Sequence, residues 1–298
     1  MTMKYAHILT ESFLRRRYLE EQQSLQVIAD EVGTHDTTVL YYMRRYHIPT
    51  RAHAEALHTP ADYASFDDLS DDWHAYWIGF IVADGCVFLD EKHSHARVQL
   101  SVKESDIEHI RNFQEGIKTS ARIRVVSNPA GRNAPGKVAI VAISNPHLVH
   151  ALAKWGIVPN KTLSLEWPTD FPPALIPAYI RGYFDGDGTV YLRQRSRPGV
   201  QWLETVCRFI SGSVPFLESL QKELQERGIK TLPSYRNQQS NAFILPVSSQ
   251  RENLLAFSDL LYRDCTVYLE RKRAIFQEME LYHAEHPRTG LNLRFKSG

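Results

Sequence analysis

The sequence predicts an α+β protein with two pseudo-symmetric α-β-β-α-β-β-α units and a small all-α domain before them. Three observations lead to this fold class: a duplicated motif, the same order of segments after each copy, and an N-terminal stretch outside the duplication. The chain has 298 residues, of which 43% are hydrophobic. That is long enough for two or three small domains, each with a core of its own.

The duplicated motif pairs "YWIGFIVADGCV" (76–87) with "YIRGYFDGDGTV" (179–190). Aligning Asp84 with Asp187 also aligns Gly79 with Gly182. Acidic residues after Ser70 in the first copy, and a proline pair in the second, are typical of a helix start. We therefore predict that each copy is an apolar helix ending at an Asp-Gly pair.

The segments that follow each copy keep one order: an alternating run, an amphipathic helix, a strand pair and a further helix. In the first copy they are 97–102, 105–117, 121–126 with 137–144, and 145–157; in the second they are 206–212, 214–229, 232–237 with 242–248, and 252–262. We assign the first repeat to residues 69–168, the second to 169–284, and a C-terminal tail to 285–298.

Residues 1–56 do not belong to the repeat and indicate a helix-turn-helix domain, joined to it by a linker at 57–68. A helix over 25–32, a turn at Gly33 and a second helix from about Asp36 to Tyr46 give this pattern. The expected buried positions are Val27, Ile28, Val32, Val39 and Met43. If the domain binds DNA, Thr37, Thr38 and Tyr41 face bases or phosphates, and Arg44, Arg45 and Arg51 contact the backbone.

The two aspartates of the motif predict a metal site. A carboxylate at the C-terminal end of a helix is repelled by the helix macrodipole. Small residues one turn earlier, Gly79 and Gly182, allow two helices to approach backbone to backbone, as small-xxx-small pairs do elsewhere. Asp84 and Asp187 then converge and repel each other unless a cation lies between them. Hard oxygen ligands select Mg²⁺ or Mn²⁺, which suit phosphodiester hydrolysis.

On these residues the chain resembles the LAGLIDADG homing endonuclease family, in its single-chain form with two motif copies, "WIGFIVADG" (77–85) and "IRGYFDGDG" (180–188). The resemblance covers about residues 69–284. It implies a site-specific double-strand DNA endonuclease of the intron-homing kind, acting on a long target site as a monomer with pseudo-twofold symmetry. It also implies saddle-shaped antiparallel sheets that lie in the DNA major groove.

The resemblance assigns roles to individual residues. Asp84 and Asp187 would be the catalytic metal ligands, helped by the carbonyls of Ala83 and Gly186, and Lys161 and Lys272 would be catalytic lysines that hold the water network. Together with the basic clusters of the sequence, it indicates DNA contacts from Lys92, Arg97, Gln99, Arg122, Arg124, Arg193, Gln194, Arg195 and Arg197.

Two other functions remain open from the sequence. A non-cleaving transcriptional regulator on the same fold also combines it with a helix-turn-helix, although a pure binder gains nothing from an anionic pair facing phosphates. The string Asp185-x-Asp187-x-Thr189 also matches the phosphatase motif D-x-D-x-T. That motif requires a strand before Asp185, where the apolar spacing predicts a helix.

Composition adds further limits. The 35 basic and 34 acidic residues give a formal charge of +1, so a nucleic-acid surface must come from local clusters. Three cysteines, far apart in the chain, indicate neither a disulfide framework nor a Cys-x-x-Cys metal site. No stretch approaches the roughly 18 apolar residues of a membrane span, and no signal peptide is visible. We expect a cytoplasmic protein without a membrane partner.

Overall fold

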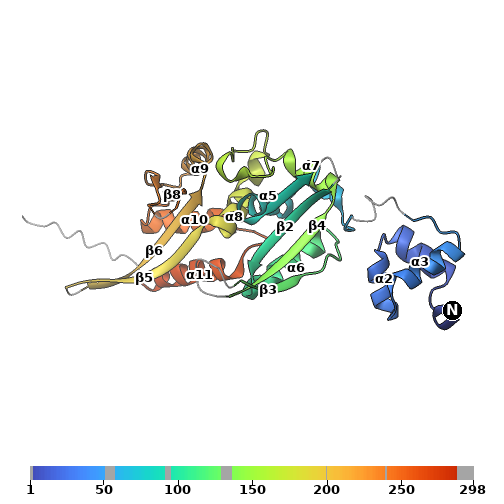
Figure 1. Cartoon of the computed structure of the whole chain (residues 1–298). Coiled ribbons are helices and arrows are strands. Elements are labelled where there is room, and N and C mark those ends of the chain that lie inside the picture. Colours follow the sequence, from blue (N-terminus) through green and yellow to red (C-terminus); the bar gives the residue numbers. More distant parts are fainter. Residues whose placement is uncertain are drawn as a thin grey trace, which may run out of the picture. The chain divides into compact units, whose positions relative to one another are not determined.

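The computed structural model describes residues 3–50, 58–90, 95–128, 136–198, 200–238 and 240–286 (Figure 1). The chain divides into two compact units. Unit 1 holds Met1–Asp67 and Cys86–Ala151, and unit 2 holds Asp68–Gly85 and Leu152–Gly298. No helix in these described ranges is long and apolar enough to cross a membrane.

The N-terminal helices of unit 1 have the boundaries that their capping residues dictate. They are α1 (Glu11–Leu14), a π-helical turn (Arg15–Glu20), α2 (Leu25–Val32) and α3 (Asp36–Arg45). The hydroxyl of Ser24 accepts a hydrogen bond from the Val27 amide at the start of α2. Gly33 ends α2 in the left-handed region, with φ of 71°. The predicted helix, turn and helix are therefore present.

The core of these helices matches the prediction only in part. Ile28, Val39 and Met43 are buried, together with Leu14 and Tyr18. Val27 was expected in the core but is 45% exposed, and Val32 is half-buried. Leu9, Ala29 and Ile48 complete the core instead. The error arose because adjacent apolar residues of a helix point in directions about 100° apart, so Val27 and Ile28 do not share one narrow face.

Unit 1 also contains a four-stranded antiparallel sheet in the order β1-β2-β4-β3. Its strands are β1 (Cys86–Asp90), β2 (His95–Lys103), β3 (Arg124–Asn128) and β4 (Gly136–Ser144), with helices α6 (Ile107–Gly116) and α7 (Pro146–Ala153). Along β2, Ala96, Val98, Leu100 and Val102 are buried and alternate with more exposed residues. That alternation is what a sheet with one buried face requires.

Part of the segment expected to be a linker packs onto unit 1. The Thr59 amide donates to the Ser144 carbonyl of β4 at 2.8 Å, and the Ser144 amide donates back to the Thr59 hydroxyl at 3.1 Å. Phe66, in a short 3₁₀ turn, is fully buried and lies 6.5 Å from the Phe113 ring. These contacts fix residues 59–66 against the sheet and its helix.

Unit 2 repeats the same topology, with the strand order β5-β6-β8-β7. Its elements are α5 (Asp72–Asp84), α8 (Ile176–Asp187), β5 (Thr189–Arg197), β6 (Val200–Ser211), α9 (Val214–Glu226), β7 (Tyr235–Arg236), β8 (Phe243–Pro246), α10 (Arg251–Tyr262) and α11 (Glu270–Glu285). The matching strand orders confirm the predicted α+β class and the duplication.

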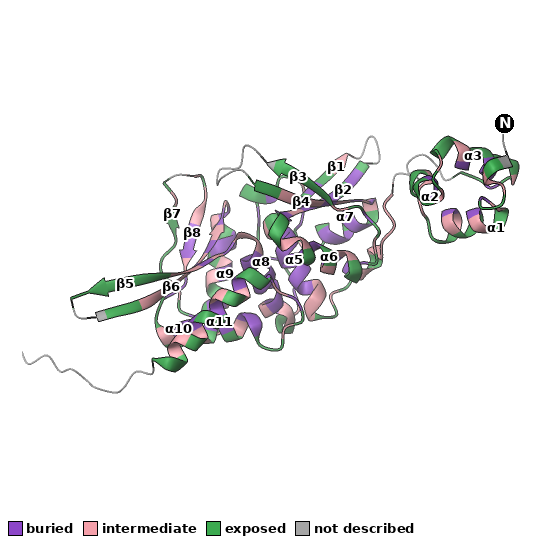
Figure 2. Cartoon of the chain, turned by 90° about the horizontal axis from the view of Figure 1, so that it is seen from below, coloured by how far each residue is buried: buried purple, intermediate pink, exposed green. Residues whose placement is uncertain are grey.

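Strands β5 and β6 extend beyond the rest of their sheet as a two-stranded ribbon (Figure 1). They pair from Thr189↔Arg208 to Arg197↔Val200, whereas β6 pairs with β8 only over Arg208–Ser211. The outer half of the ribbon is largely exposed, in contrast to the buried helices α5 and α8 (Figure 2). Such a ribbon has room for a partner on its faces.

The close approach of α5 and α8 should make Gly182 intolerant of any side chain. A Cβ at Gly182 would overlap the carbonyl oxygen of Tyr76, which is backbone and cannot rotate away. We expect Gly182→Ala to lower the free energy of unfolding by about 3 kcal/mol, measured by urea denaturation. Gly136→Ala is the matched control because nothing lies within 4 Å of its added Cβ. Equal stability of the two variants would contradict this packing.

Candidate active site

Helices α5 and α8 of unit 2 pack directly against each other through their glycines. A Cβ at Gly79 would overlap the Tyr179 carbonyl oxygen, and a Cβ at Gly182 would overlap the Tyr76 carbonyl oxygen. The two contacts are reciprocal because aligned residues exchange roles, which gives the helix pair a local twofold relation. Near the C-terminal end, a Cβ at Gly186 would overlap that of Ala83. Small residues therefore line the close contact between the two helices.

Asp84 and Asp187 are the last residues of these two helices. Gly85 and Gly188 follow them as extended C-cap residues, and their amides donate to Ile81 and Phe184 in the preceding turn. Asp187 is half-buried, and Asp84 retains exposed surface. Both carboxylates thus lie at the same end of one helix pair, where the macrodipoles repel negative charge.

The electrostatics show that the two carboxylates are close to each other. Burial and, after it, the negative charge of Asp84 raise the pKa of Asp187 to about 7, against the opposing effect of Lys272 and Lys161. Burial also raises the pKa of Asp84, again against the pull of nearby cations. Among the described residues, no hydrogen bond to either carboxyl group offsets these shifts. The pair therefore has an uncompensated need for positive charge.

The donor set fits a hard divalent cation. Two carboxylates with neighbouring backbone carbonyls are an oxygen-only site, and Mg²⁺ is usually held by one or two carboxylates while it keeps several waters. The described residues include no cluster of three or more histidine, cysteine, aspartate or glutamate side chains suited to a metal.

Lys161 and Lys272 occupy equivalent places at the ends of α5 and α8. The ammonium of Lys161 donates to the Gly85 carbonyl at 2.5 Å, and that of Lys272 donates to the aligned Gly188 carbonyl at 2.5 Å. Lys272 also donates to the Phe184 carbonyl at 2.6 Å and to the Asp185 carbonyl at 2.8 Å. Both lysines are buried, at 8% and 3% exposure.

The two lysines supply positive charge where both the helix ends and the aspartates need it. Their hydrogen bonds reach carbonyls at the helix ends, where no following turn supplies backbone donors. Burial lowers the pKa of Lys272 to about 8, and neighbouring carboxylates oppose that shift. Both lysines were predicted as site residues from their position after the last helix of each repeat. Their contacts with backbone carbonyls were not predicted.

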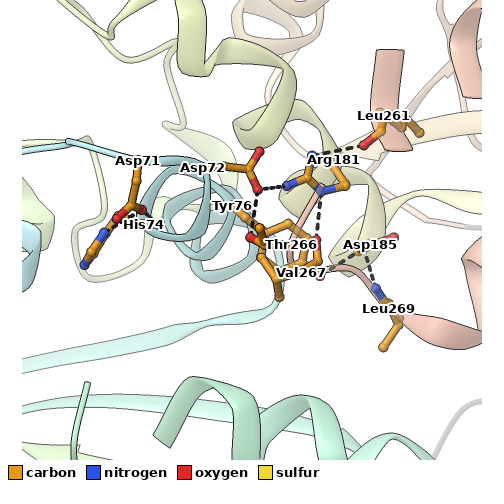
Figure 3. A network of polar contacts seen from close by, with 10 residues as sticks. All are labelled: Asp71, Asp72, His74, Tyr76, Arg181, Asp185, Leu261, Thr266, Val267 and Leu269. Carbon is orange, nitrogen blue, oxygen red and sulfur yellow. Dashed lines mark hydrogen bonds and ion pairs between the residues drawn. The ribbon is translucent and has the colours of Figure 1, made fainter. Parts of the chain in front are cut away.

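Asp185 differs from the other two aspartates because it is fully buried and hydrogen-bonded. Its carboxylate accepts hydrogen bonds from the Tyr76 hydroxyl at 2.9 Å and the Leu269 amide at 2.7 Å (Figure 3). The Tyr262 hydroxyl also donates to it, at 3.3 Å. It lies within α8 and does not follow a strand. The phosphatase motif, which needs an accessible nucleophile after a strand, is therefore wrong for this chain.

Arg181 forms a buried ion pair that the sequence did not reveal. Its guanidinium, 2% exposed, contacts Asp72 of α5 at 2.5 Å and donates to the carbonyls of Val267 and Leu261 (Figure 3). A basic residue inside an apolar helix was its only signal, since a buried charge requires a partner. Asp72, in the first turn of α5, is that partner, so the pair ties the start of α5 to the middle of α8.

The sequence model of the family described as "LAGLIDADG-like domain" matches residues 174–262. This range contains α8 and the whole second sheet. Residues 174–262 are therefore similar to a LAGLIDADG-like domain. The match agrees with the resemblance found from the motif, and the first repeat lies outside it. A comparison with curated proteins gives no match.

Solved structures were found that resemble this chain, and one of I-SmaMI has the same fold. A variant of I-SmaMI superposes with a TM-score of 0.52 at 10% identity, covering 73% of this chain and 93% of that one. Meganuclease I-SmaMI bound to uncleavable DNA gives 0.49 at 12% identity, with 71% and 89% covered. A structure of homing endonuclease I-DmoI gives 0.47 at 14%, with 73% and 99% covered. At such identities the likeness to I-SmaMI concerns the fold alone.

Within residues 174–262, the side chains expected to contact DNA lie on the exposed ribbon. Arg193, Gln194, Arg195 and Arg197 are all exposed on β5. Arg193 and Arg195 each donate to the Glu204 carboxylate at 2.6 Å, which lowers the pKa of Glu204 to about 2. The two arginines are therefore partly neutralised within the protein, and neither is a free cation.

The remaining expected DNA contacts belong to unit 1. Arg97 and Gln99 lie on β2, Arg124 lies on β3 and Arg122 precedes it, with all three arginines exposed. In the N-terminal helices Thr37, Tyr41, Arg44 and Arg45 are exposed on α3, and Thr38 is half-buried. Arg51 and Lys92 lie outside the described residues.

The raised pKa of Asp187 makes the stability of the metal-free protein depend on pH. The folded state holds a proton on Asp187 up to about pH 7, whereas the unfolded chain releases it near its ordinary pKa of 3.8. The stabilisation of the folded state by the protonated Asp187 carboxyl is therefore lost as the pH rises through about 7. We expect Asp187→Asn to be more stable than the wild type by several degrees in Tm above that pH, measured by thermal unfolding with chelator present.

The same series in acid is the control for this prediction. At a pH near 4 the carboxyl of Asp187 is already protonated, so the wild type and Asp187→Asn should have nearly equal Tm. Adding Mg²⁺ in alkaline buffer should raise the Tm of the wild type and leave that of the variant largely unchanged. A Tm difference that stays constant over the whole pH range would contradict the raised pKa.

Proposed function

We propose that the protein is a site-specific, metal-dependent endonuclease that cuts both strands of double-stranded DNA, acting as a monomer. One observation carries this proposal: Asp84 and Asp187 end a glycine-packed helix pair without any hydrogen bond to satisfy them, and burial and mutual repulsion raise the pKa of Asp187. A bound cation would remove the repulsion between the two carboxylates. Cation-assisted hydrolysis of phosphodiesters uses such carboxylate pairs.

The residues of the site would have different roles in hydrolysis. Mg²⁺ or Mn²⁺, when bound, would polarise the phosphate and make water more acidic. Asp84 and Asp187, with the carbonyls of Ala83 and Gly186, would hold it. Lys161 and Lys272 would orient water and balance charge that develops on the phosphate oxygens. Water adds to phosphorus as the bond to the 3′ or 5′ oxygen breaks, and that oxygen takes up a proton.

DNA binding would come from two surfaces. The exposed arginines on β5 and the basic residues of β2 and β3 lie on strands, which can enter a major groove. The exposed face of α3, with Tyr41, Arg44 and Arg45, suits a second contact through a helix-turn-helix. Contacts from both surfaces would cover a long DNA target site. Local basic clusters of this kind would be needed because the chain as a whole is nearly neutral.

A second candidate function is a DNA-binding regulator that does not cleave. The observation in its favour is that backbone carbonyls at the ends of α5 and α8 already accept hydrogen bonds from Lys161 and Lys272. These bonds explain both lysines as structural caps without any catalytic role. The regulator leaves the unsatisfied aspartate pair unexplained, so we prefer the nuclease.

Cleavage of a randomised double-stranded target library in Mg²⁺ tests the proposal. We expect the wild type to cut a discrete set of sites, and Asp84→Asn or Asp187→Asn to lose at least about 100-fold in rate, since each removes a metal ligand. Asp259→Asn is the matched control because that carboxylate lies on α10 in an exposed ion pair with Arg263. Sequence-specific binding by the wild type without cleavage would overturn the nuclease and support the regulator.

The helix-turn-helix contact has its own test. Arg44→Ala with Arg45→Ala should weaken binding to the selected target and reduce the slope of log K against log salt by about 2, one for each lost phosphate contact. Arg15→Ala is the control, since Arg15 is already paired with Glu11 at 2.8 Å. An unchanged slope in the double variant would place this face away from DNA.

A further inference from the structure

The two repeats hold their lysines in different ways. Lys161 donates to the Gly85 carbonyl from a short turn, whereas Lys272 lies in the first turn of a long helix and donates to several carbonyls at the end of α8. The position that precedes the metal-binding aspartate by two residues is Val82 in the first repeat and Asp185 in the second. The buried carboxylate of Asp185 in the second repeat therefore has no counterpart at the aligned position of the first.

Asp185 connects three elements around Lys272. Tyr76 of α5 and Tyr262 at the end of α10 donate to its carboxylate through their hydroxyls. The third donor is the backbone amide of Leu269, the residue immediately before α11. The carboxylate is thus held by α5, by α10 and by the start of α11.

The Leu269 contact sets the position of the lysine. The carbonyl of Leu269 accepts the Lys272 amide at 2.9 Å, so the first turn of α11 begins at the residue that Asp185 anchors. The Lys272 side chain then reaches back to the carbonyls of α8. A shift of Leu269 would move the whole turn, because backbone hydrogen bonds link the two residues.

Asp185 also supplies the negative charge that a buried ammonium requires. Lys272 is 3% exposed and Asp185 has no exposed surface. The Lys272 ammonium donates to the main-chain carbonyl of Asp185 at 2.8 Å, so the Asp185 carboxylate belongs to one of the residues that the ammonium contacts. With Lys272 compensated in this way, Asp187 does not have to serve as its counter-ion.

We propose that Asp185 is a positioning residue of the second repeat, which fixes the Lys272 ammonium at the end of α8 and balances its charge so that Asp187 remains available to a cation. Val82 cannot do this in the first repeat, so the two halves of the site are built unequally. The functional part of this inference rests on the proposed nuclease. Its structural part, the dependence of Lys272 on Asp185, does not.

Amine-reactive labelling of the full-length protein, read by mass spectrometry, tests that dependence without measuring activity. In the wild type we expect Lys272 and Lys161 to react slowly and the exposed Lys222, at 78% side-chain exposure, to react quickly. Asp185→Asn should raise the labelling of Lys272 several-fold and leave Lys161 unchanged. Ser258→Ala is the matched control, since it removes a buried contact to Glu280 and leaves Asp185 intact. Unchanged Lys272 labelling in folded Asp185→Asn overturns the proposal.

A stability cycle covers the case in which Asp185→Asn folds poorly. Removing one partner of a buried charge pair leaves the other uncompensated, whereas removing both does not. The Tm lost by Asp185→Asn with Lys272→Met should therefore be smaller than the sum of the two single losses. If Asp185→Asn alone does not fold, the double variant should still fold. Additive losses, or an unfolded double variant in that case, overturn the proposal.

On a target found with the library, strand-resolved cleavage tests the functional part. Asp185→Asn should slow the cutting of one strand several-fold more than the other, so that nicked DNA accumulates. Equal slowing of both strands overturns the assignment to one repeat. If the wild type cuts no DNA, the proposed nuclease fails, while the labelling and the stability cycle still decide whether Asp185 positions Lys272.

Discussion

The contact between the backbones of α5 and α8 is the constraint on which the rest of unit 2 depends. Gly79 and Gly182 meet the carbonyls of Tyr179 and Tyr76 so closely that any side chain would overlap them. This packing sets the separation of the two helix ends, and therefore of Asp84 and Asp187. It also explains why both helices are buried nearly all round, since each presents one face to its partner and the others to the surrounding elements.

Bringing two helix C-termini together concentrates negative charge at one place, and the structure offsets only part of it. Lys161 and Lys272 donate to the aligned carbonyls of Gly85 and Gly188, which compensates the helix ends. The carboxylates of Asp84 and Asp187 gain no hydrogen bond and keep raised pKa values. The fold thus tolerates an anionic pair that it could have neutralised, which is the physical basis for assigning a cation to it.

Arginines in this chain serve both packing and surface roles, and burial separates the two. Arg181 is buried and pairs with Asp72, so it joins the two helices. Arg193 and Arg195 are exposed on the ribbon, but Glu204 holds both guanidiniums on the neighbouring strand. Such pairing limits how the two side chains can turn, and it shows why a formal charge near zero is compatible with a surface that presents oriented guanidinium groups.

The sequence by itself determined the duplication, the ends of the helices, the glycine interface and the two aspartates that share one place in the motif. These features depend on periodicity, capping residues and aligned positions, which are local patterns that can be recognised in one sequence. Tertiary structure decided which partners the buried charged groups contact. Asp185 accepts from Leu269 and Tyr76, Arg181 pairs with Asp72, and Lys272 donates to the carbonyls of α8. It also exposed Val27 and placed residues 59–66 against a sheet. Partners far apart in the chain are chosen by packing, and no local pattern records that choice.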